Sequence, residues 1–389
     1  MKIKAILLCV LCIFLCSCGQ SEKEITVEES DISEPVFQEV DGLWNCFQIT
    51  ECTLDTPEIC VGSYCVYDGK VYYEVNYSEQ LIDQTGRSEN IPFEEKYNTE
   101  IRSHDMVSGT EEVIYKYSAD WCVDIKDIVC NGKYLIWEDV DDVWKVNVLE
   151  VGTDTYPVVV VTGAQNEGDL LEIVPTATEE DIYWYNKNGS DNNCISLYRY
   201  NFAKQEISLV RSGLDLTSPY TRLPITEGLY TMFARMGNNS CRIMVHNIQG
   251  EEEKVINVST EVCRPISNQN YCVWNRGYDD LSSILFVYDF VNQKTEKMDL
   301  SNGYSFSHAL LGRYVIVNQR KDSVYGKEGL YCFDMVDKVY EQLEIEKTEN
   351  QTLLYTSQGL DENVYLQIAD DTSDFRIINI QIKSNIYNE

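Results

Sequence analysis

Short runs of apolar and aromatic residues alternate with polar loops along the chain from residue 42 onward. The runs are rich in Tyr, Val, Ile and Trp, and no window in this region keeps an apolar period of 3.6 residues over three turns. Short runs of β-branched and aromatic residues are typical of strands. The pattern therefore predicts an all-β fold with little helix.

A triplet recurs at the end of one strand-like run in each unit of the chain. It consists of an aromatic, His or aliphatic residue, then Asp, Asn or Glu, then an apolar residue. The seven copies are centred on Asp105, Glu150, Asn201, Asn247, Asp289, Asp334 and Asn379. Their centres are separated by 45, 51, 46, 42, 45 and 45 residues. A period of roughly 40 to 50 residues in β sequence is typical of propeller blades, so we expect a seven-bladed β-propeller of four-stranded antiparallel sheets.

Turn residues predict how the strands of a blade are joined. Asp68-Gly69 and Asn131-Gly132 indicate type I′ hairpin turns, in which both central residues need φ > 0. The Asp or Asn of each triplet can hydrogen-bond backbone groups of the turn that follows it. Only nine residues follow Ile380, so the last blade lacks a strand. We expect the apolar run from Leu43 to Thr50 to supply that strand and close the ring.

The N-terminus resembles a bacterial lipoprotein signal. Lys2 and Lys4 precede an apolar run from Ala5 to Cys16, which is shorter than the about 20 residues needed to span a bilayer. The run continues into Leu15-Cys16-Ser17-Cys18, which is similar to a lipobox with Cys18 in the lipidated position. The resemblance implies a signal peptide over residues 1–17 and a diacylglyceryl group on Cys18. The alternative is an ordinary secretory signal with a chance cysteine.

Acidic residues dominate the composition, with 64 Asp and Glu against 31 Lys and Arg, giving a formal charge of −33. Such a charge repels nucleic acid and anionic lipid headgroups, so we expect no nucleic-acid partner and a membrane contact through the lipid anchor. Residues 19–41 carry eight acidic groups and one lysine, which predicts a flexible acidic tether over residues 18–41 before a propeller at 42–389. The predicted location is the cell membrane, facing outside the cytoplasm.

The cysteines argue against a metal ribbon or a redox motif. Eleven cysteines follow Cys18, an odd number, and none forms a C-x-x-C pair. At least one must therefore stay unpaired, and no metal or cofactor is predicted. Cys65, Cys130 and Cys272 lie in apolar runs, so we expect them to be buried and to act as small hydrophobic residues.

Carboxylates are frequent in the expected loops between the second and third strands of the blades. A candidate binding rim consists of Asp139, Asp141, Asp142, Asp279, Asp280, Asp370 and Asp371. One interpretation is a rim that recruits a cation or a basic partner. The other is ordinary turn chemistry, because Asp and Asn are what such loops need.

A single histidine is a candidate for the central channel. His308 lies in the run Ser305 to Leu310, the expected innermost strand of blade six. A side chain facing the channel could serve as a ligand or a base, and the alternative is a structural histidine. We find no G-x-S-x-G, P-loop, H-E-x-x-H or sialidase Asp-box motif, so no catalytic residue is assigned and a non-enzymatic role is favoured.

Several strands resemble known propeller repeats. The run Ile182 to Asn186 resembles the Tyr-Trp-Thr-Asp strand of YWTD propellers. The runs LYRYN, LFVYD and LYCFD, which begin at Leu197, Leu285 and Leu330, resemble TolB-type repeats, although the Pro-x-Trp-Ser-Pro-Asp-Gly stretch of TolB is missing. Over residues 42–389 the chain is similar to surface lipoproteins of Firmicutes that carry such propellers.

Together these features predict a membrane-anchored extracytoplasmic lipoprotein whose propeller binds or assembles a protein or glycan partner. Two alternatives remain open. One is a carbohydrate-active hydrolase with two acids placed across the ring, and the other is a solute-sensing lipoprotein with a site at the central channel.

Overall fold

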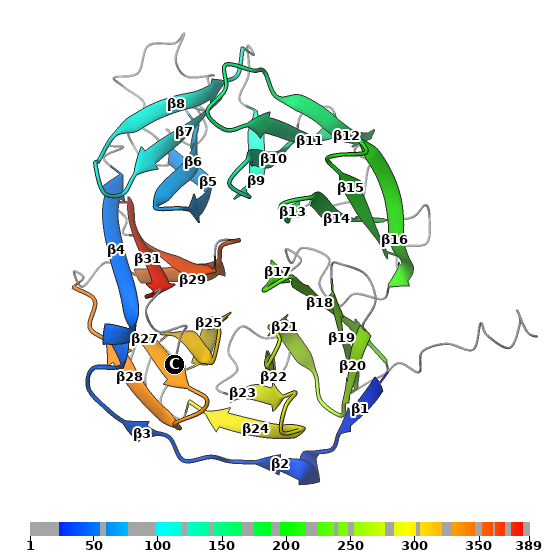
Figure 1. The fold of residues 1–389 in the computed structure, drawn as a ribbon, viewed down its shortest axis with the longest axis vertical. Coiled ribbons are helices and arrows are strands. Elements are labelled where there is room, and N and C mark those ends of the chain that lie inside the picture. Colours follow the sequence, from blue (N-terminus) through cyan, green and yellow to red (C-terminus); the bar gives the residue numbers. More distant parts are fainter. Residues whose placement is uncertain are drawn as a thin grey trace, which may run out of the picture.

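The computed structural model forms a ring of seven sheets around a central axis (Figure 1). It describes residues 23–54, 60–76, 99–118, 123–140, 143–164, 175–187, 195–214, 225–236, 240–247, 253–276, 284–300, 304–320, 329–346, 352–360, 362–369 and 375–383. Apart from two short 3-10 turns, these residues form no helix. None of the described helical segments is long and apolar enough to cross a membrane.

In blades 1 to 6, four antiparallel strands follow one another in chain order from the innermost to the outermost position. Blade 1 contains β5 (Cys60–Tyr67), β6 (Lys70–Asn76), β7 (Thr99–Asp105) and β8 (Glu111–Lys116). Blade 2 contains β9 (Asp124–Cys130), β10 (Tyr134–Val140), β11 (Val143–Glu150) and β12 (Val158–Ala164). Blade 3 contains β13 (Thr176–Ala177), β14 (Asp181–Lys187), β15 (Ile195–Asn201) and β16 (Glu206–Leu214).

The other blades repeat this plan. Blade 4 contains β17 (Ile225–Thr226), β18 (Leu229–Arg235), β19 (Cys241–Asn247) and β20 (Glu253–Val258). Blade 5 contains β21 (Val262–Ser267), β22 (Tyr271–Arg276), β23 (Ile284–Asp289) and β24 (Lys294–Asp299). Blade 6 contains β25 (Tyr304–Leu311), β26 (Tyr314–Arg320), β27 (Gly329–Asp334) and β28 (Val339–Leu343). Blade 7 contains β29 (Thr352–Gln358), β30 (Asn363–Ala369) and β31 (Phe375–Ile382).

The N-terminal side of the chain completes blade 7. Strand β4 (Phe47–Leu54) pairs antiparallel with β31 as its outermost strand, so the predicted seven-bladed propeller and its closure by an N-terminal strand are confirmed. The strand begins later than the sequence suggests, because Leu43–Cys46 forms a 3-10 turn, η2. Trp44 in this turn donates from its backbone N–H to Glu341 Oε2 at 2.8 Å.

Apolar side chains fill the spaces between blades and so form the core. Cys65, Cys130 and Cys272 are buried in these clusters, as expected of small hydrophobes. Trp137, Trp184 and Trp274 lie in the second strands of blades 2, 3 and 5 and are at most 2 % exposed. Truncating a large buried side chain of this kind to Ala lowers the free energy of unfolding by roughly 3 to 5 kcal/mol. The inter-blade clusters therefore stabilise the ring.

The triplet caps the turn between the third and fourth strands, as predicted. Its side-chain oxygen accepts a hydrogen bond from the backbone N–H three residues later in four blades: Asp105 from Ser108 at 2.7 Å, Asn201 from Lys204 at 2.9 Å, Asp289 from Asn292 at 2.8 Å and Asp334 from Asp337 at 3.1 Å. The residue one further along has positive φ, and it is Gly109, Gln205, Gln293 or Lys338.

The two predicted type I′ turns have different outcomes. Asp68 and Gly69 both have positive φ, at 46° and 69°, so the first prediction is confirmed. The second is wrong, because only Gly132 has positive φ, at 89°. Asn131 instead precedes the turn, and its Oδ1 accepts from the backbone N–H of Tyr134 at 2.7 Å.

The acidic segment before residue 42 is not a free tether where the structure describes it. Three short strands pair in parallel with the outer strands of three blades: β1 (Lys23–Val27) with β20, β2 (Ile32–Ser33) with β24, and β3 (Gln38–Glu39) with β28. We call residues 23–46 the belt, which runs outside blades 4, 5 and 6 (Figure 1). The tether prediction is wrong for residues 23–41, because backbone pairing and buried apolar residues such as Val27 outweigh the repulsion of the acidic side chains.

Candidate functional site

Most predicted site residues lie outside the described residues. These are Cys18, Asp141, Asp142, Asp279, Asp280, Asp370 and Asp371. Asp139 and His308 are described. Asp139 is buried rather than exposed on a rim, whereas His308 lies in the innermost strand of blade 6, as expected. In the described residues no group of three or more His, Cys, Asp or Glu side chains is placed to hold a metal ion.

Asp139 belongs to a buried polar network rather than to an exposed rim. It lies in β10 and is 2 % exposed. Its Oδ2 accepts from Tyr117 Oη at 2.6 Å and from Asn147 Nδ2 at 2.7 Å, while Lys145 Nζ lies 3.8 Å from Oδ1. Burial raises the pKa of Tyr117, and the charge of Asp139 raises it further. The phenol therefore stays protonated and donates, so this carboxylate links blades 1 and 2.

His308 packs between two blades rather than facing the channel. It is 8 % exposed and lies in β25, the innermost strand of blade 6. Leu310, two residues on and therefore on the same face of the strand, belongs to the apolar cluster between blades 5 and 6. Burial lowers the pKa of His308 to about 4, and the charge of Arg264 in blade 5 lowers it too. A neutral imidazole in this place is a structural side chain.

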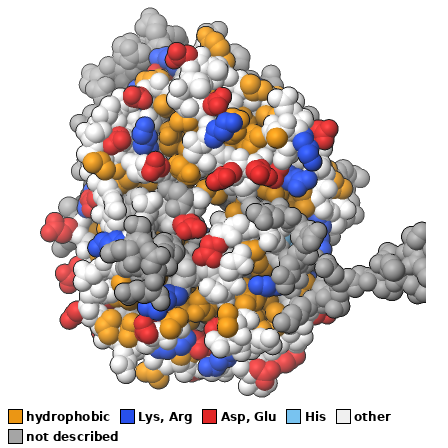
Figure 2. Space-filling view, in the orientation of Figure 1, with side chains coloured by type: hydrophobic (Ala, Val, Ile, Leu, Met, Phe, Trp, Pro, Cys, Tyr) orange, Lys and Arg blue, Asp and Glu red, His pale blue; other side chains and the backbone are white. Residues whose placement is uncertain are grey.

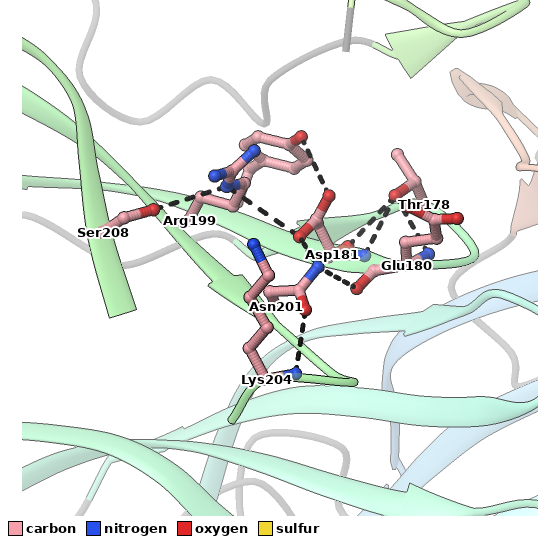
Figure 3. Close-up of polar contacts among 8 residues, drawn as sticks. Thr178, Glu180, Asp181, Arg199, Asn201, Lys204 and Ser208 are labelled. Carbon is pink, nitrogen blue, oxygen red and sulfur yellow. Dashed lines mark hydrogen bonds and ion pairs between the residues drawn. The ribbon is translucent and has the colours of Figure 1, made fainter. Parts of the chain in front are cut away.

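A second buried carboxylate is likewise held by its neighbours (Figure 3). Asp181 accepts from Asn201 Nδ2 at 2.8 Å, and its Oδ1 lies 3.9 Å from Arg199 Nε. Tyr183 Oη donates to Oδ2 at 3.5 Å. Asn201 is the triplet residue of blade 3, so one side chain caps its own turn and holds this carboxylate.

The first hairpin turn of blade 7 reaches across the ring. Leu360 in this turn packs against the apolar cluster between blades 2 and 3, on another side of the ring. Burial raises the pKa of Glu227, in the first turn of blade 4, and the charge of Glu362 in the turn of blade 7 raises it as well. Acidic side chains lie near the centre of the face that Figure 2 shows. Turns from blades on different sides of the ring thus meet at the axis.

The outer margin of blades 2 and 3 is apolar and is not covered by any described strand. No described strand pairs with the outer edges of β8, β12 and β16. The exposed fractions are 63 % for Val158 in β12 and 48 % and 54 % for Ile207 and Leu209 in β16. Val255 and Ile256, in the covered outer strand β20 of blade 4, are at most 1 % exposed. We call β12 and β16 the uncovered margin.

The exposed side chains of β12 and β16 lie on the faces of blades 2 and 3 that are turned toward each other. Ile207 and Leu209 pair with Tyr200 and Tyr198, which pack into the cluster between blades 2 and 3. Val158 pairs with Val148, a member of the same cluster. Cross-strand partners lie on one face of a sheet, so these exposed residues flank the outer end of the same inter-blade space.

A pocket of about 260 Å³ lies where the belt crosses from blade 5 to blade 6. The described lining comprises Pro35, Phe37, Glu39, Met298, Asp299, Leu300, Gln319, Tyr331, Phe333, Tyr340 and Gln342. Phe333 stacks on Tyr340 at 5.4 Å between centroids, and Phe37 meets Phe333 edge-on at the same distance. We call this the belt pocket.

Sequence reasoning missed both the uncovered margin and the belt pocket. Tyr331 and Phe333 lie in the LYCFD run. This run predicted a strand, but it did not indicate that the belt packs against it. The apolar residues of β16 gave a signal. Apolar side chains that stay exposed in the outermost strand of a blade indicate a surface that another segment could cover.

Comparison with solved structures places the fold among β-propellers. No protein-family model matches the chain, and no curated protein matches it by sequence. The chain is similar to the β-propeller domain of the Trilobed protease from Pyrococcus furiosus, with a TM-score of 0.56 and 10 % identity, over 82 % of this chain and 95 % of that one. It is also similar to an uncharacterized protein from Listeria monocytogenes, with a TM-score of 0.52 and 9 % identity, over 82 % and 94 % of the two chains.

A peptidase provides a third comparison. The acylaminoacyl peptidase from Pyrococcus horikoshii has a TM-score of 0.53 and 10 % identity, and the match covers 80 % of this chain and 49 % of that one. These identities show the fold alone, because one fold serves many functions.

Proposed function

We propose that this chain is a non-enzymatic binding module that holds a protein partner at the uncovered margin, carried outside the cytoplasm on a lipid attached to Cys18. The propeller fold is consistent with a protein-binding module. The observation that carries the proposal is the exposed apolar edge of β12 and β16.

The belt indicates which partner fits. The chain's own N-terminal segment adds strands to the outer edges of blades 4, 5 and 6 and inserts apolar side chains between them. Val27 and Ile32 pack between blades 4 and 5, and Phe37 between blades 5 and 6. The margin of blades 2 and 3 offers a backbone edge that no described strand pairs with, together with exposed apolar side chains. The partner is therefore an extended protein segment with apolar residues at alternate positions, which adds a strand to the sheet.

The acidic surface also selects the partner. A formal charge of −33 favours a segment whose flanks carry Lys or Arg. Edges of this kind cause aggregation when nothing covers them, which is consistent with a margin that is occupied in the cell.

Site-specific photocrosslinking in intact cells tests the proposal. A photoreactive residue replaces Leu209 or Val158, and the control position is Val336, which is 56 % exposed in a turn of blade 6. We expect one discrete protein crosslinked from both margin positions and not from Val336, and lost when Ile207→Asp is added. Crosslinks only to a second copy of this chain, equal crosslinking from Val336, or no crosslink would each overturn the proposal.

The anchor is tested separately with Cys18→Ala and the matched control Cys16→Ala. We expect C18A to abolish metabolic labelling by fatty acid and to release the protein from membranes, while C16A retains both. Labelling that persists in C18A would overturn the anchor and leave the margin proposal standing.

A further inference from the structure

The belt pocket combines aromatic rings with negative charge. Phe37, Tyr331, Phe333 and Tyr340 contribute rings, and Glu39 and Asp299 contribute carboxylates. Among its described lining residues there is no Lys or Arg. The nearby Lys338 lies outside the lining and pairs with Glu296.

The rings stay neutral while the carboxylates supply the charge. Burial raises the pKa of Tyr340, and the adjacent Glu39 raises it further, partly through a hydrogen bond of 3.4 Å from Tyr340 Oη. Burial also raises the pKa of Tyr331. The tyrosines are therefore protonated at neutral pH, so the polarity of the described lining comes from two exposed carboxylates and the amides of Gln319 and Gln342.

Ring geometry favours a positively charged guest. Phe37 meets Phe333 edge-on at an interplanar angle of 87°, and Phe333 stacks on Tyr340, so the three rings form one continuous aromatic part of the lining. Ring faces carry negative potential and attract cations within about 6 Å. Lys338 Nζ lies 5.7 Å from the Phe37 centroid, which shows that this ring is already in reach of a cation.

We infer that the belt pocket binds an alkylammonium group, either the head of a small quaternary amine or the side chain of a lysine. Its volume of about 260 Å³ is below the about 300 to 1,000 Å³ typical of drug-sized ligands, which suits a single head group. The guest nitrogen lies against the rings while Glu39 and Asp299 balance its charge. The site is separate from the uncovered margin.

Titration of the purified chain with choline tests the site. The control ligand is 3,3-dimethylbutan-1-ol, which has the shape of choline but carries carbon in place of the charged nitrogen. We expect choline to bind, with an affinity that falls as salt is raised, and the neutral analogue to bind at least about fivefold more weakly, since a cation–π contact contributes about 1 kcal/mol. Nα-acetyl-lysine-N-methylamide and its trimethylated form then distinguish a lysine source from a free amine.

Three variants locate the binding. Phe37→Leu keeps the belt apolar but removes a ring face, and Glu39→Gln removes a charge without changing shape. Each is expected to weaken choline binding about fivefold. Val36→Ala, in the same stretch but 83 % exposed, is expected to change nothing. Equal binding of the neutral analogue, binding of a neutral hexose in place of choline, or no binding of any probe would overturn the inference.

Discussion

Asn268 in the first turn of blade 5 donates from Nδ2 to the backbone carbonyl oxygen of Gly312 in the same turn of blade 6, at 2.6 Å. Its Oδ1 accepts from the backbone N–H of Tyr271 at 2.8 Å, within its own turn. Asn131 makes the same pair of contacts, and its Nδ2 reaches the carbonyl oxygen of Thr178 in blade 3 at 2.7 Å. One side chain thus shapes a hairpin and ties two blades together.

Replacing Asn268 by Asp separates these two roles. Asp keeps an acceptor for the turn but places a carboxylate beside the Gly312 carbonyl, so the inter-blade bond is lost. We expect the free energy of unfolding in urea to fall by about 1 to 3 kcal/mol. Asn270→Asp, exposed in the same turn, is the control and should have little effect. Equal stability of N268D and the parent chain would show that the contact contributes nothing.

Glu227 predicts a dependence of stability on pH. Burial and the charge of Glu362 raise its pKa in the folded chain above its usual value. The folded state then binds more protons than the unfolded state between the two pKa values, so this group reduces stability as pH rises through that window. Glu227→Gln should therefore stabilise the chain at pH 7, and the gain should disappear below the usual pKa of Glu, about 4.3.

Unfolding curves at pH 7 and at pH 3.5 measure this effect. The control is Glu179→Gln, which is exposed in the first turn of blade 3. A gain of the same size at both pH values would mean that the effect of E227Q comes from shape and not from charge.

The repeat could be predicted because the contacts that shape each blade's turns are made between residues close together in the sequence. Asp105, Asn201, Asp289 and Asp334 cap their turns through backbone groups only three residues away, so the sequence pattern carries the geometry directly. The belt could not be predicted in this way. Its packed apolar residues, Val27, Ile32 and Phe37, are widely spaced, and each packs against blades that are roughly 200 residues or more away along the chain.

The exposed position expected for Asp139 was wrong for a similar reason. Asp139 is followed by acidic residues and looks like part of a loop. Its partners are nevertheless Tyr117, just after the end of β8 in blade 1, and Asn147 in the adjacent strand β11. A strand end and a loop start have the same composition here, and only the tertiary pairing distinguishes them.

Loss of Asp139 should be costly because its partners are buried. Asp139→Ala leaves the donors of Tyr117 and Asn147 without their acceptor, and we expect a loss of about 3 kcal/mol in unfolding free energy. Asp154→Ala, an exposed residue of the same blade, is the control. A double-mutant cycle with Tyr117→Phe should give a coupling of about 0.5 to 3 kcal/mol, and additive effects would remove the proposed link between blades 1 and 2.

Positive φ in the triplet turn predicts a stabilising glycine. Gln205 has a φ of 54°, while blade 1 places Gly109 at the same point. A residue with a Cβ pays about 1 kcal/mol or more in this region, so Gln205→Gly should raise the unfolding free energy by up to about 1 kcal/mol. Ala203→Gly, two residues earlier without positive φ, should lower it by about 0.5 to 1 kcal/mol. The same sign for both changes would contradict the turn geometry.

Glu341 holds the end of the belt on blade 6. Its two carboxylate oxygens accept from the backbone N–H groups of Gly42 at 3.0 Å and Trp44 at 2.8 Å, and its own carbonyl oxygen accepts from Trp44 Nε1 at 3.2 Å. Glu341→Ala removes the two carboxylate contacts and leaves the backbone one, so the belt should open locally more often than the blades do. We expect faster hydrogen exchange of backbone amides in residues 38–46, with the amides of β31 unchanged. Glu344→Ala, exposed just beyond β28, is the matched control. Unchanged exchange in E341A would mean that strand pairing alone fixes the belt, whereas equal acceleration in β31 would mean that the belt and the closing blade open as one unit.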